Sequence, residues 1–182
     1  MSNNYFSPTP KISGGALFAT FNSKEGNIYW RLLKQIANNQ NKKGNFDGAN
    51  PINVKLSQDE AADVIRAVRT NSTSSFYHKF DDNVTTGKFS YYELDGQDKE
   101  GKPTKRKGFG LTVKKGEKEV KIGFTLASAE RLSLFLQNAL THIMDAEYAE
   151  DIKQAKEYAA KKKDSPQESP EPAPNQEEDK EF

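Results

Sequence analysis

Residues 84–126 read VTTGKFSYYELDGQDKEGKPTKRKGFGLTVKKGEKEVKIGFTL, which is three alternating apolar runs separated by two turn signals. In the last run, residues 120–126, every second side chain is apolar and therefore falls on one face of a strand. Turn signals occur around Gly96, where a long polar insert follows, and around Gly116. The pattern predicts an antiparallel meander of three strands.

This meander is rich in cations and aromatic rings. Residues 99–121 hold nine Lys or Arg against three Glu. Phosphate is the expected ligand of such a cationic surface, and aromatic rings suit unstacked bases. Gly108, Gly110 and Gly123 would keep one sheet face low, so that a backbone or a base could approach it closely.

The composition bounds the class of protein. The chain has 182 residues, of which 34% are hydrophobic, so we expect one domain of ordinary size and a solvated remainder. Cysteine is absent, which excludes disulfides, thiolate zinc sites and cysteine nucleophiles, and is typical of a reducing compartment. Because no long apolar run occurs, we expect neither a signal peptide nor a membrane span.

The net charge of +1 conceals an asymmetry along the chain. Residues 1–163 carry 26 cations and 19 acids, whereas residues 164–182 carry seven acids and one Lys. The body is thus +7 and the last segment is −6. A basic body attracts a polyanion, and an acidic segment joined to it can occupy the same surface when the polyanion is absent.

The N-terminal half is expected to mix strands, loops and one helix. Residues 1–13 are polar and predict a loose N-terminal arm, residues 16–21 alternate as a strand, and residues 38–51 form a polar loop. Residues 28–36 fit either a strand or a helix. We favour the strand because of the turn before it and an internal repeat described below.

The first helix follows a strand at residues 52–56. Ser57 and Glu60 have the spacing of a capping box, which predicts a helix that runs to about Thr70. Its inward side chains are expected to be Ala61, Val64, Ile65 and Val68. A further strand is predicted at residues 76–80, before the meander.

After the meander comes the strongest helical pattern of the chain. Apolar residues recur at three- and four-residue steps: Leu132, Phe135, Leu136, Ala139, Leu140, Ile143 and Met144. The pattern weakens over residues 145–163, which we expect to form a helical extension. From Asp164 the composition becomes Pro, Glu, Ser and Gln, which predicts a disordered acidic tail over residues 164–182.

An internal repeat links the two halves. Residues 51–68 lie over residues 121–138 at an offset of 70. The aligned pairs are Leu56 with Leu126, Glu60 with Glu130, Val64 with Leu134, and Ile65 with Phe135. We predict an α+β fold made of two copies of an antiparallel strand meander followed by a helix, although any strand–helix junction shows some such likeness.

No catalytic constellation is present in the sequence. His78 and His142 are 64 residues apart, and neither has the spacing of a metal ligand. The glycines around Phe109 lack the spacing of a phosphate loop and the Lys-Ser/Thr that follows one. The sequence therefore predicts no catalytic residue, no metal and no cofactor.

The functional candidates are the rings and cations of the strands. Candidates for base stacking are Tyr29, Trp30, Tyr77, Phe89, Tyr91, Tyr92 and Phe109. Candidates for phosphate contact are Arg31, Lys34, Lys79, Lys88, Lys105, Arg106, Lys107, Lys114, Lys115 and Lys121. Because side chains alternate along a strand, about half of the rings must face the helices, and any one of them could be a core residue.

Two copies of strands followed by a helix, with a basic aromatic sheet, resemble the Whirly and PUR-type single-stranded nucleic-acid-binding fold over residues 14–144. The acidic segment that ends in Phe182 is similar to the tails of bacterial and phage single-stranded DNA-binding proteins. Lys180 and Glu181 stand where the bacterial tails have further aspartates and Pro. The tail resemblance implies docking of replication or repair enzymes by Glu177, Glu178, Asp179, Glu181 and Phe182.

We therefore expect a non-enzymatic single-stranded DNA-binding protein that acts in replication, recombination or repair, in the cytoplasm of a bacterial or phage-infected cell. Its expected partners are single-stranded DNA and the enzymes that bind the tail, with no membrane; self-association stays open. One alternative is an RNA-binding or transcription-regulating protein on the same fold. Another is a structural or adaptor protein that interacts through the long helix and the tail.

Overall fold

The computed structural model describes residues 2–9, 13–36, 45–97 and 100–164. Within them the chain forms two antiparallel sheets and two helices, and each sheet is followed by one helix. The predicted α+β class is therefore confirmed, and so is the long C-terminal helix. No helix of the described residues is long and apolar enough to cross a membrane.

The first sheet is centred on the strand whose type was ambiguous in the sequence. Its strands are β1 (Ser2–Ser7), β2 (Gly15–Asn22), β3 (Asn27–Ile36), β4 (Asn45–Phe46) and β5 (Ile52–Leu56). β3 pairs with β2 along one edge and with β5 and the short β4 along the other. Ile28, Trp30 and Leu32 are buried at alternate positions, so the strand interpretation of residues 28–36 is confirmed.

The N-terminal residues form a strand, and the prediction of a loose arm over residues 1–13 is wrong for β1. This strand pairs with β2 along its whole length. Tyr5 is only 4% exposed; its ring lies 5.4 Å from that of Phe124, and the Arg131 guanidinium lies 4.8 Å from its centre. Burial of this ring, together with the contacts of Phe6 with Phe18 and Phe46, favours ordering of a short segment whose other residues are polar.

The second sheet confirms the predicted meander. Its strands are β6 (Thr73–Phe80), β7 (Asn83–Gln97), β8 (Pro103–Lys115) and β9 (Lys118–Thr125), in that spatial order. Phe89, Leu111 and Ile122 lie opposite one another on adjacent strands and are buried. β6 begins at Thr73 rather than at Phe76, so the strand is longer than predicted.

Helix α1 (Gln58–Thr70) begins with the predicted capping box. The Glu60 backbone N–H donates to Ser57 Oγ at 3.2 Å, and the Ser57 N–H donates to the Glu60 carboxylate at 2.8 Å. Asn71 ends the helix in the left-handed conformation, with φ of 49°. All four residues predicted to face inward are buried: Ala61, Val64, Ile65 and Val68.

Helix α2 (Leu126–Asp164) buries its first half as predicted, with one exception. Leu132, Phe135, Leu136, Ala139 and Ile143 are buried, and Leu140 packs partly buried against the same core. Met144 is 61% exposed, because the burial of this helix ends at Ile143. His142 stacks on Phe21 of β2 with ring centres 5.8 Å apart, which places it on the flank of the helix.

The internal repeat holds, but at an offset of 68 residues rather than the predicted 70. Corresponding buried pairs are Ile52 with Val120, Val54 with Ile122, Leu56 with Phe124, Ala61 with Ala129, Val64 with Leu132, and Val68 with Leu136. Of the predicted pairs, Ile65 and Phe135 are both buried, but the partners of Leu56 and Val64 fail, because Leu126 and Leu134 are 46% and 56% exposed. The two offsets differ by two residues. In a strand, residues two apart lie on the same face, whereas in a helix they are about 200° apart. Only the helices therefore distinguish an offset of 68 from one of 70.

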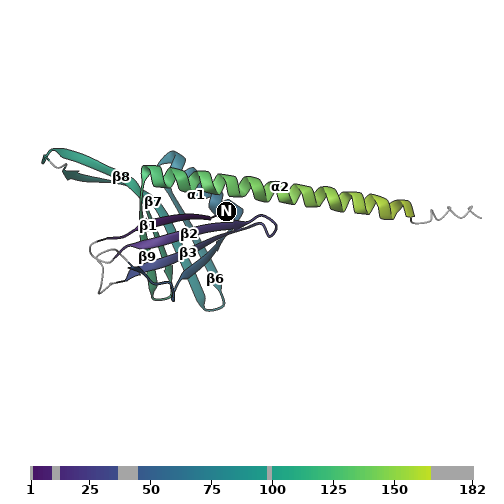
Figure 1. Cartoon of the computed structure of the whole chain (residues 1–182), viewed down its shortest axis with the longest axis horizontal. Coiled ribbons are helices and arrows are strands. Elements are labelled where there is room, and N and C mark those ends of the chain that lie inside the picture. Colours follow the sequence, from purple (N-terminus) through teal and green to yellow (C-terminus); the bar gives the residue numbers. More distant parts are fainter. Residues whose placement is uncertain (1, 10–12, 37–44, 98–99, 165–182) are drawn as a thin grey trace, which may run out of the picture. The chain divides into compact units, whose positions relative to one another are not determined.

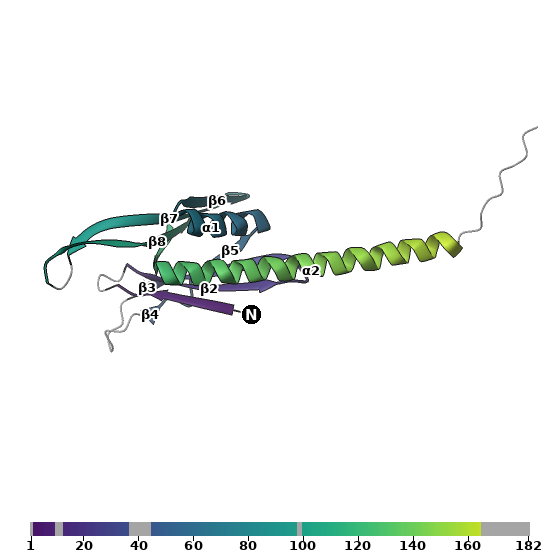
Figure 2. The same cartoon turned by 90° about the horizontal axis from the view of Figure 1, so that it is seen from above.

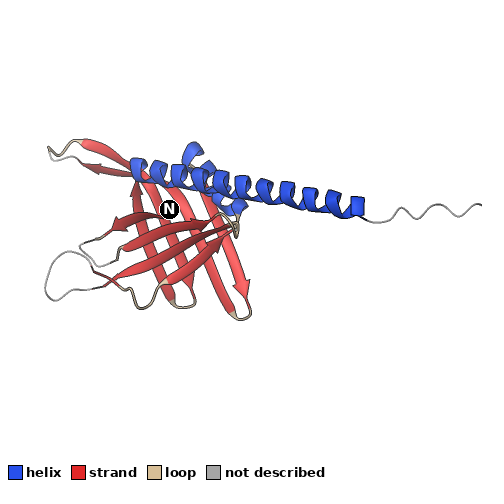
Figure 3. Ribbon diagram, turned by 45° about the vertical axis from the view of Figure 1, so that its right-hand side comes forward, coloured by secondary structure: helices blue, strands red, loops and turns tan. Residues whose placement is uncertain are grey.

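The two sheets share one core. Their strands run across one another, as Figures 1 and 3 show, and β9 contacts β1, β2 and β3. Trp30 of the first sheet meets Phe76 of the second, with ring centres 6.3 Å apart. Helix α1 and the buried first half of α2 lie along one end of the strands in Figures 1 and 3, and Figure 2 gives the view from above. Each sheet therefore has an inner face in the core and an outer face turned away from it.

The chain divides into two compact units, Met1–Glu147 and Tyr148–Phe182. The first unit holds both sheets, α1 and the buried half of α2. The second holds the rest of α2, which is helical as far as Asp164. The acidic tail predicted for residues 164–182 lies outside the described residues from 165 onward, and so do the five residues expected to bind partners, Glu177, Glu178, Asp179, Glu181 and Phe182.

Candidate nucleic-acid interface

The outer face of the second sheet gathers many of the predicted binding residues. Strand pairing places them in rows across β6 to β9, because directly opposed residues in antiparallel strands share a face. One row contains Tyr77, Thr86, Lys114 and Glu119, the next contains Ser75, Lys88, Thr112 and Lys121, and a third contains Thr73, Ser90, Gly110 and Gly123. Tyr92 and Gly108 follow in the next row, with Leu94 and Arg106 beyond them, and Lys79 lies at the opposite end. We call this surface the β6–β9 outer face.

The three predicted glycines all lie on this face, in β8 and β9. Gly110 and Gly123 are direct partners, and a Cβ added to Gly110 would meet no heavy atom within 4 Å. Gly108 differs, because a Cβ there would lie 2.8 Å from Tyr92 Oη, so this tyrosine covers it. The β6–β9 outer face is therefore low and open at Gly110, with Tyr92 on one side and, at Gly123, Ser7 of β1, whose Oγ accepts from the Gly123 N–H at 3.1 Å.

Acidic residues separate and orient some of the lysines. Glu119 pairs with Lys121 at 3.1 Å and with Lys114 at 3.2 Å. Hydrogen bonds from Lys121 and Lys114 lower the pKa of the Glu119 carboxyl below its ordinary value. The Glu119 carboxylate therefore holds the ammonium group of Lys114, from its own row, and that of Lys121, from the next row.

A second acid has the same role on the β7–β8 hairpin. Glu93 pairs with Lys105 at 2.7 Å and with Lys107 at 3.3 Å. Hydrogen bonds from Lys105 and Lys107 lower the pKa of Glu93, and its carboxylate raises the pKa of Lys105. Because these two lysines are on the opposite side of β8 from Arg106, they do not belong to the β6–β9 outer face.

The remaining predicted cations are dispersed. Arg31 lies on the outer face of the first sheet, where its Nη2 donates to the Gly48 carbonyl at 3.0 Å. Lys34 lines a separate pocket of mixed charge that also includes Asp47 and Glu117. Lys115 is exposed at the end of β8, on the side opposite to Lys114. The predicted set of ten cations is thus not one surface.

Three of the seven predicted stacking rings belong to the core. Trp30, Phe89 and Phe109 are between 1% and 2% exposed. Phe89 and Phe109 stack on each other with ring centres 5.0 Å apart. Buried rings are inaccessible to a base, so these three residues are corrected to core positions; packing against the helices and the other sheet accounts for them.

The other four predicted rings reach the surface to different degrees. Tyr77 is 63% exposed on the β6–β9 outer face, and Tyr92 lies on the same face, half-buried. Tyr91 points the other way, packs edge-on against Phe109 and donates its hydroxyl to Glu93 at 3.3 Å. Tyr29 is on the outer face of the first sheet, 36% exposed.

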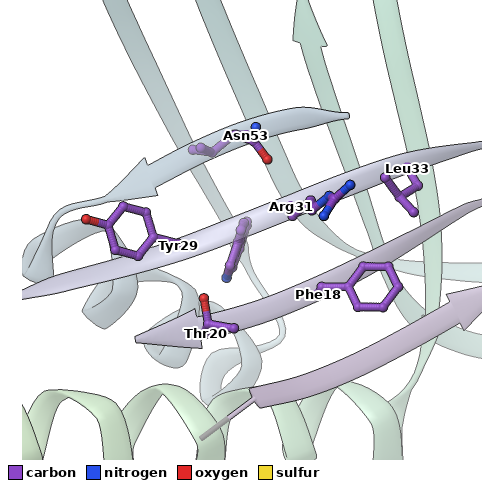
Figure 4. Close-up of a pocket in the computed structure, with 8 residues that line it drawn as sticks. Phe18, Thr20, Tyr29, Arg31, Leu33 and Asn53 are labelled. Carbon is purple, nitrogen blue, oxygen red and sulfur yellow. The ribbon is translucent and has the colours of Figure 1, made fainter. Parts of the chain in front are cut away.

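A pocket on the first sheet was not predicted. It has a volume of about 450 Å³ and lies on β2, β3 and β5. In Figure 4 Phe18 of β2 lies beside its strand partner Arg31 of β3, Thr20 is the partner of Tyr29, and Asn53 lies on the neighbouring strand. Phe18 was missed because it alternates with Leu17 and Ala19 in an unbroken apolar run, where no polar neighbour marks the outer face.

The part of the chain that the structure describes contains no candidate metal site. No group of three or more His, Asp or Glu side chains there is arranged to hold a metal ion. His78 instead pairs with Glu60 of α1 at 2.8 Å and stacks on Phe76.

Comparison with known proteins gives little. No family model and no curated protein matches the chain. A solved structure of Trypanosoma brucei MRP1/MRP2 is similar to it with a TM-score of 0.49 and 14% sequence identity, over 76% of this chain and 83% of that chain. A match at this level assigns neither a family nor a function to the chain.

Proposed function

We propose that the chain is a non-enzymatic single-stranded DNA-binding protein of replication, recombination or repair, on a fold of the Whirly or PUR type. The observation that carries this proposal is the composition of the β6–β9 outer face. There two tyrosines and five cations surround a centre made of glycine and small polar residues: Tyr77, Tyr92, Lys79, Lys88, Arg106, Lys114 and Lys121. The pairing of one sheet with one helix in each half supports the fold assignment.

In this proposal the cations bind phosphates and release condensed counterions. Lys79, Lys88 and Arg106 form no ion pair within the described residues, so a phosphate meets no internal competitor there. Lys114 and Lys121 share Glu119, which leaves each of them with part of its charge uncompensated. Binding of this kind depends strongly on salt.

The rings supply the preference for unpaired bases. Tyr77 is exposed enough to offer a full face to a base, and Tyr92 lies beside the open strip at Gly110. Bases of a duplex are stacked on each other and cannot stack on a protein side chain without being flipped out. Stacking tolerates any base, so we expect little sequence preference.

A structural or adaptor role is the second candidate, and exposed apolar side chains on α2 favour it. Met144, Tyr148 and Ile152 follow one another at four-residue steps and are 61%, 67% and 38% exposed. Side chains at this spacing form one stripe on a helix, and such a stripe suits a protein partner. In this case polynucleotide binding would be absent.

Titration of the full chain separates these functions. Labelled oligo-dT, oligo-U and a duplex of equal length are each titrated at two salt concentrations. The proposal predicts tight, salt-dependent binding of oligo-dT and weak binding of the duplex. A clear preference for oligo-U would favour the RNA-binding alternative, since the 2′-hydroxyl distinguishes the two polymers. Equal affinity for oligo-dT and duplex, or no binding, would contradict the proposal.

A further inference from the structure

The pocket on the outer face of the first sheet has the properties of a ligand site. Its volume of about 450 Å³ lies within the ~300–1,000 Å³ of small-molecule sites in proteins. Phe18 and Leu33 give it apolar walls, and Thr20 and Asn53 add polar groups at the surface of the sheet. A pocket with apolar walls and a few polar groups suits a flat, partly polar ring.

Contacts within the protein hold the pocket's side chains in place before any ligand arrives. The Tyr29 hydroxyl donates to Glu25 at 3.2 Å and accepts from Asn27 at 3.0 Å. Phe18 meets Phe6 edge to face, with ring centres 5.6 Å apart. The entropic cost of ordering these rings on ligand binding is therefore small, as expected for a preformed site.

The charge of the pocket is positive. Arg31 is the direct strand partner of Phe18 and forms no ion pair with a carboxylate among the described residues. Lys55 is the direct strand partner of Tyr29 and is also exposed. The Glu25 carboxylate already accepts a hydrogen bond from the Tyr29 hydroxyl. An anion beside a stacked ring would complement this arrangement.

We propose that this pocket binds one unpaired base of a single-stranded polynucleotide, stacked on Tyr29 or Phe18, with the adjacent phosphate at Arg31. This inference rests on the proposed function and adds a second site to it. The ligand is a segment of a strand, and a free nucleotide is an alternative that the test below distinguishes.

The two sites lie on faces that point away from each other. Trp30 and Phe76 join the inner faces of the two sheets, and Tyr5 and Phe124 do so at β1 and β9. Figure 2 shows the strands of β6 and of β1 and β2 on opposite sides of the helices. One short oligonucleotide cannot cover both outer faces, so the chain binds two of them independently.

Calorimetric titration with a thymidine oligonucleotide of about four nucleotides, at the lower end of known single-strand site sizes, tests this. The full chain is expected to bind two oligonucleotides. At the concentrations at which the full chain binds two oligonucleotides, the double variants Phe18→Ala/Tyr29→Ala and Lys88→Ala/Lys121→Ala are each expected to bind one, because each weakens a different site. Tyr158→Ala, which removes an exposed ring of α2, is the matched control and keeps both.

A second readout does not depend on the stability of the variants. An oligonucleotide with 5-iododeoxyuridine is photocrosslinked to the unaltered chain, and the attached residues are mapped by mass spectrometry. Crosslinks at Tyr29 or Phe18 support the inference. The crosslinking is then repeated with thymidine monophosphate as competitor, at equal nucleotide concentration. Loss of the crosslinks at Tyr29 and Phe18 would identify a free-nucleotide site and overturn the claim for a strand.

The failures of the two proposals are distinguishable. One oligonucleotide per chain, crosslinked only to β6–β9 residues, would overturn the pocket and leave the proposed function standing. Affinity and stoichiometry unchanged in Phe18→Ala/Tyr29→Ala would do the same. Absence of any oligonucleotide binding would overturn both. If the pocket is correct, the double variant weakens binding at that site roughly ten- to hundredfold.

Discussion

Gly110 of β8 lies directly opposite Gly123 of β9, and a Cβ added to Gly110 would meet no heavy atom within 4 Å. Side chains are thus missing from the middle of the β6–β9 outer face, while Lys88 and Lys121 lie one row away. Glycine weakens a strand, so a pair of glycines on β8 and the edge strand β9 needs a reason. Close approach of a polynucleotide to the sheet is the reason that the proposed function offers.

The first prediction concerns Gly110. Gly110→Ile should keep or raise the stability of the sheet, since the site is open and a β-branched residue suits a strand. The same change should weaken oligo-dT binding, because the new side chain stands in the strand's path. Urea unfolding and a binding titration measure the two effects. An unchanged affinity would show that no ligand approaches this strip.

Gly87→Ala is the matched control, because it tests a glycine of the inner face. An added Cβ there would overlap the ring of Phe76, which fills the space above this glycine. Overpacking of this kind costs about 1–3 kcal/mol. Gly87→Ala should therefore lower the free energy of unfolding, while the folded fraction keeps its affinity for oligo-dT.

The second prediction separates the cations of the interface from the rest. Lys88→Ala/Lys121→Ala should reduce the slope of log K against log salt by about 0.7 for each phosphate contact that is lost on a single strand. Lys156→Ala, an exposed lysine of α2 outside the proposed interface, should leave the slope as it is. Equal slopes for both variants would mean that these two lysines do not contact phosphate.

The third prediction contrasts a core ring with a surface ring. Trp30 is 1% exposed, so Trp30→Ala should cost about 3–5 kcal/mol of unfolding free energy. Tyr77 is 63% exposed, so Tyr77→Ala should leave stability nearly unchanged and weaken oligo-dT binding by about 1–3 kcal/mol per stacked base. Denaturant unfolding and titration of both variants check this. A Trp30→Ala protein that keeps its stability but no longer binds oligo-dT would contradict the assignment of Trp30 to the core.

Trp30 and Tyr77 show which parts of the fold could be predicted from the sequence. Alternation identified the strands around Trp30, Phe89 and Tyr77, but alternation defines two faces without saying which one is buried. That choice depends on what packs against each sheet, and the helices and the other sheet are distant in the chain. The capping box of α1 was predictable because both of its residues lie within one helical turn.

Other features needed tertiary contacts. β1 is ordered by contacts of Tyr5 with residues more than a hundred positions away, and its own sequence is mostly polar. The pocket around Arg31 joins three strands, and its wall at Phe18 is hidden in an apolar run. Seven of the seventeen residues predicted to bind nucleic acid share the β6–β9 outer face, because tyrosines and cations recur there at two-residue steps along the strands.

The fourth prediction concerns Glu119 and pH. Its pKa is lowered in the folded protein, so its ion pairs stabilise the fold above the ordinary glutamate value of 4.5 and are lost as pH falls through the lowered pKa. Glu119→Gln removes this contribution and releases Lys114 and Lys121. The variant should bind oligo-dT more tightly at neutral pH, with a steeper salt slope. Weaker binding would show that positioning of the two lysines by the carboxylate outweighs its competition with phosphate.

The fifth prediction concerns the acidic segment. Residues 164–182 carry a net charge of −6 and residues 1–163 carry +7, so we expect the segment to compete with phosphate for the body. Truncation after Lys163 should tighten oligo-dT binding, most at low salt, because salt screens both attractions. A titration of the two proteins at two salt concentrations measures this. Weaker binding after truncation would contradict a competing role.

The most direct test of single-strand binding on the β6–β9 outer face is an amide chemical-shift titration of the full chain with oligo-dT. The largest shifts should centre on Ser90, Gly110 and Gly123, and a duplex of equal length should not produce them. Shifts that avoid this face, or that appear equally with the duplex, would contradict the account.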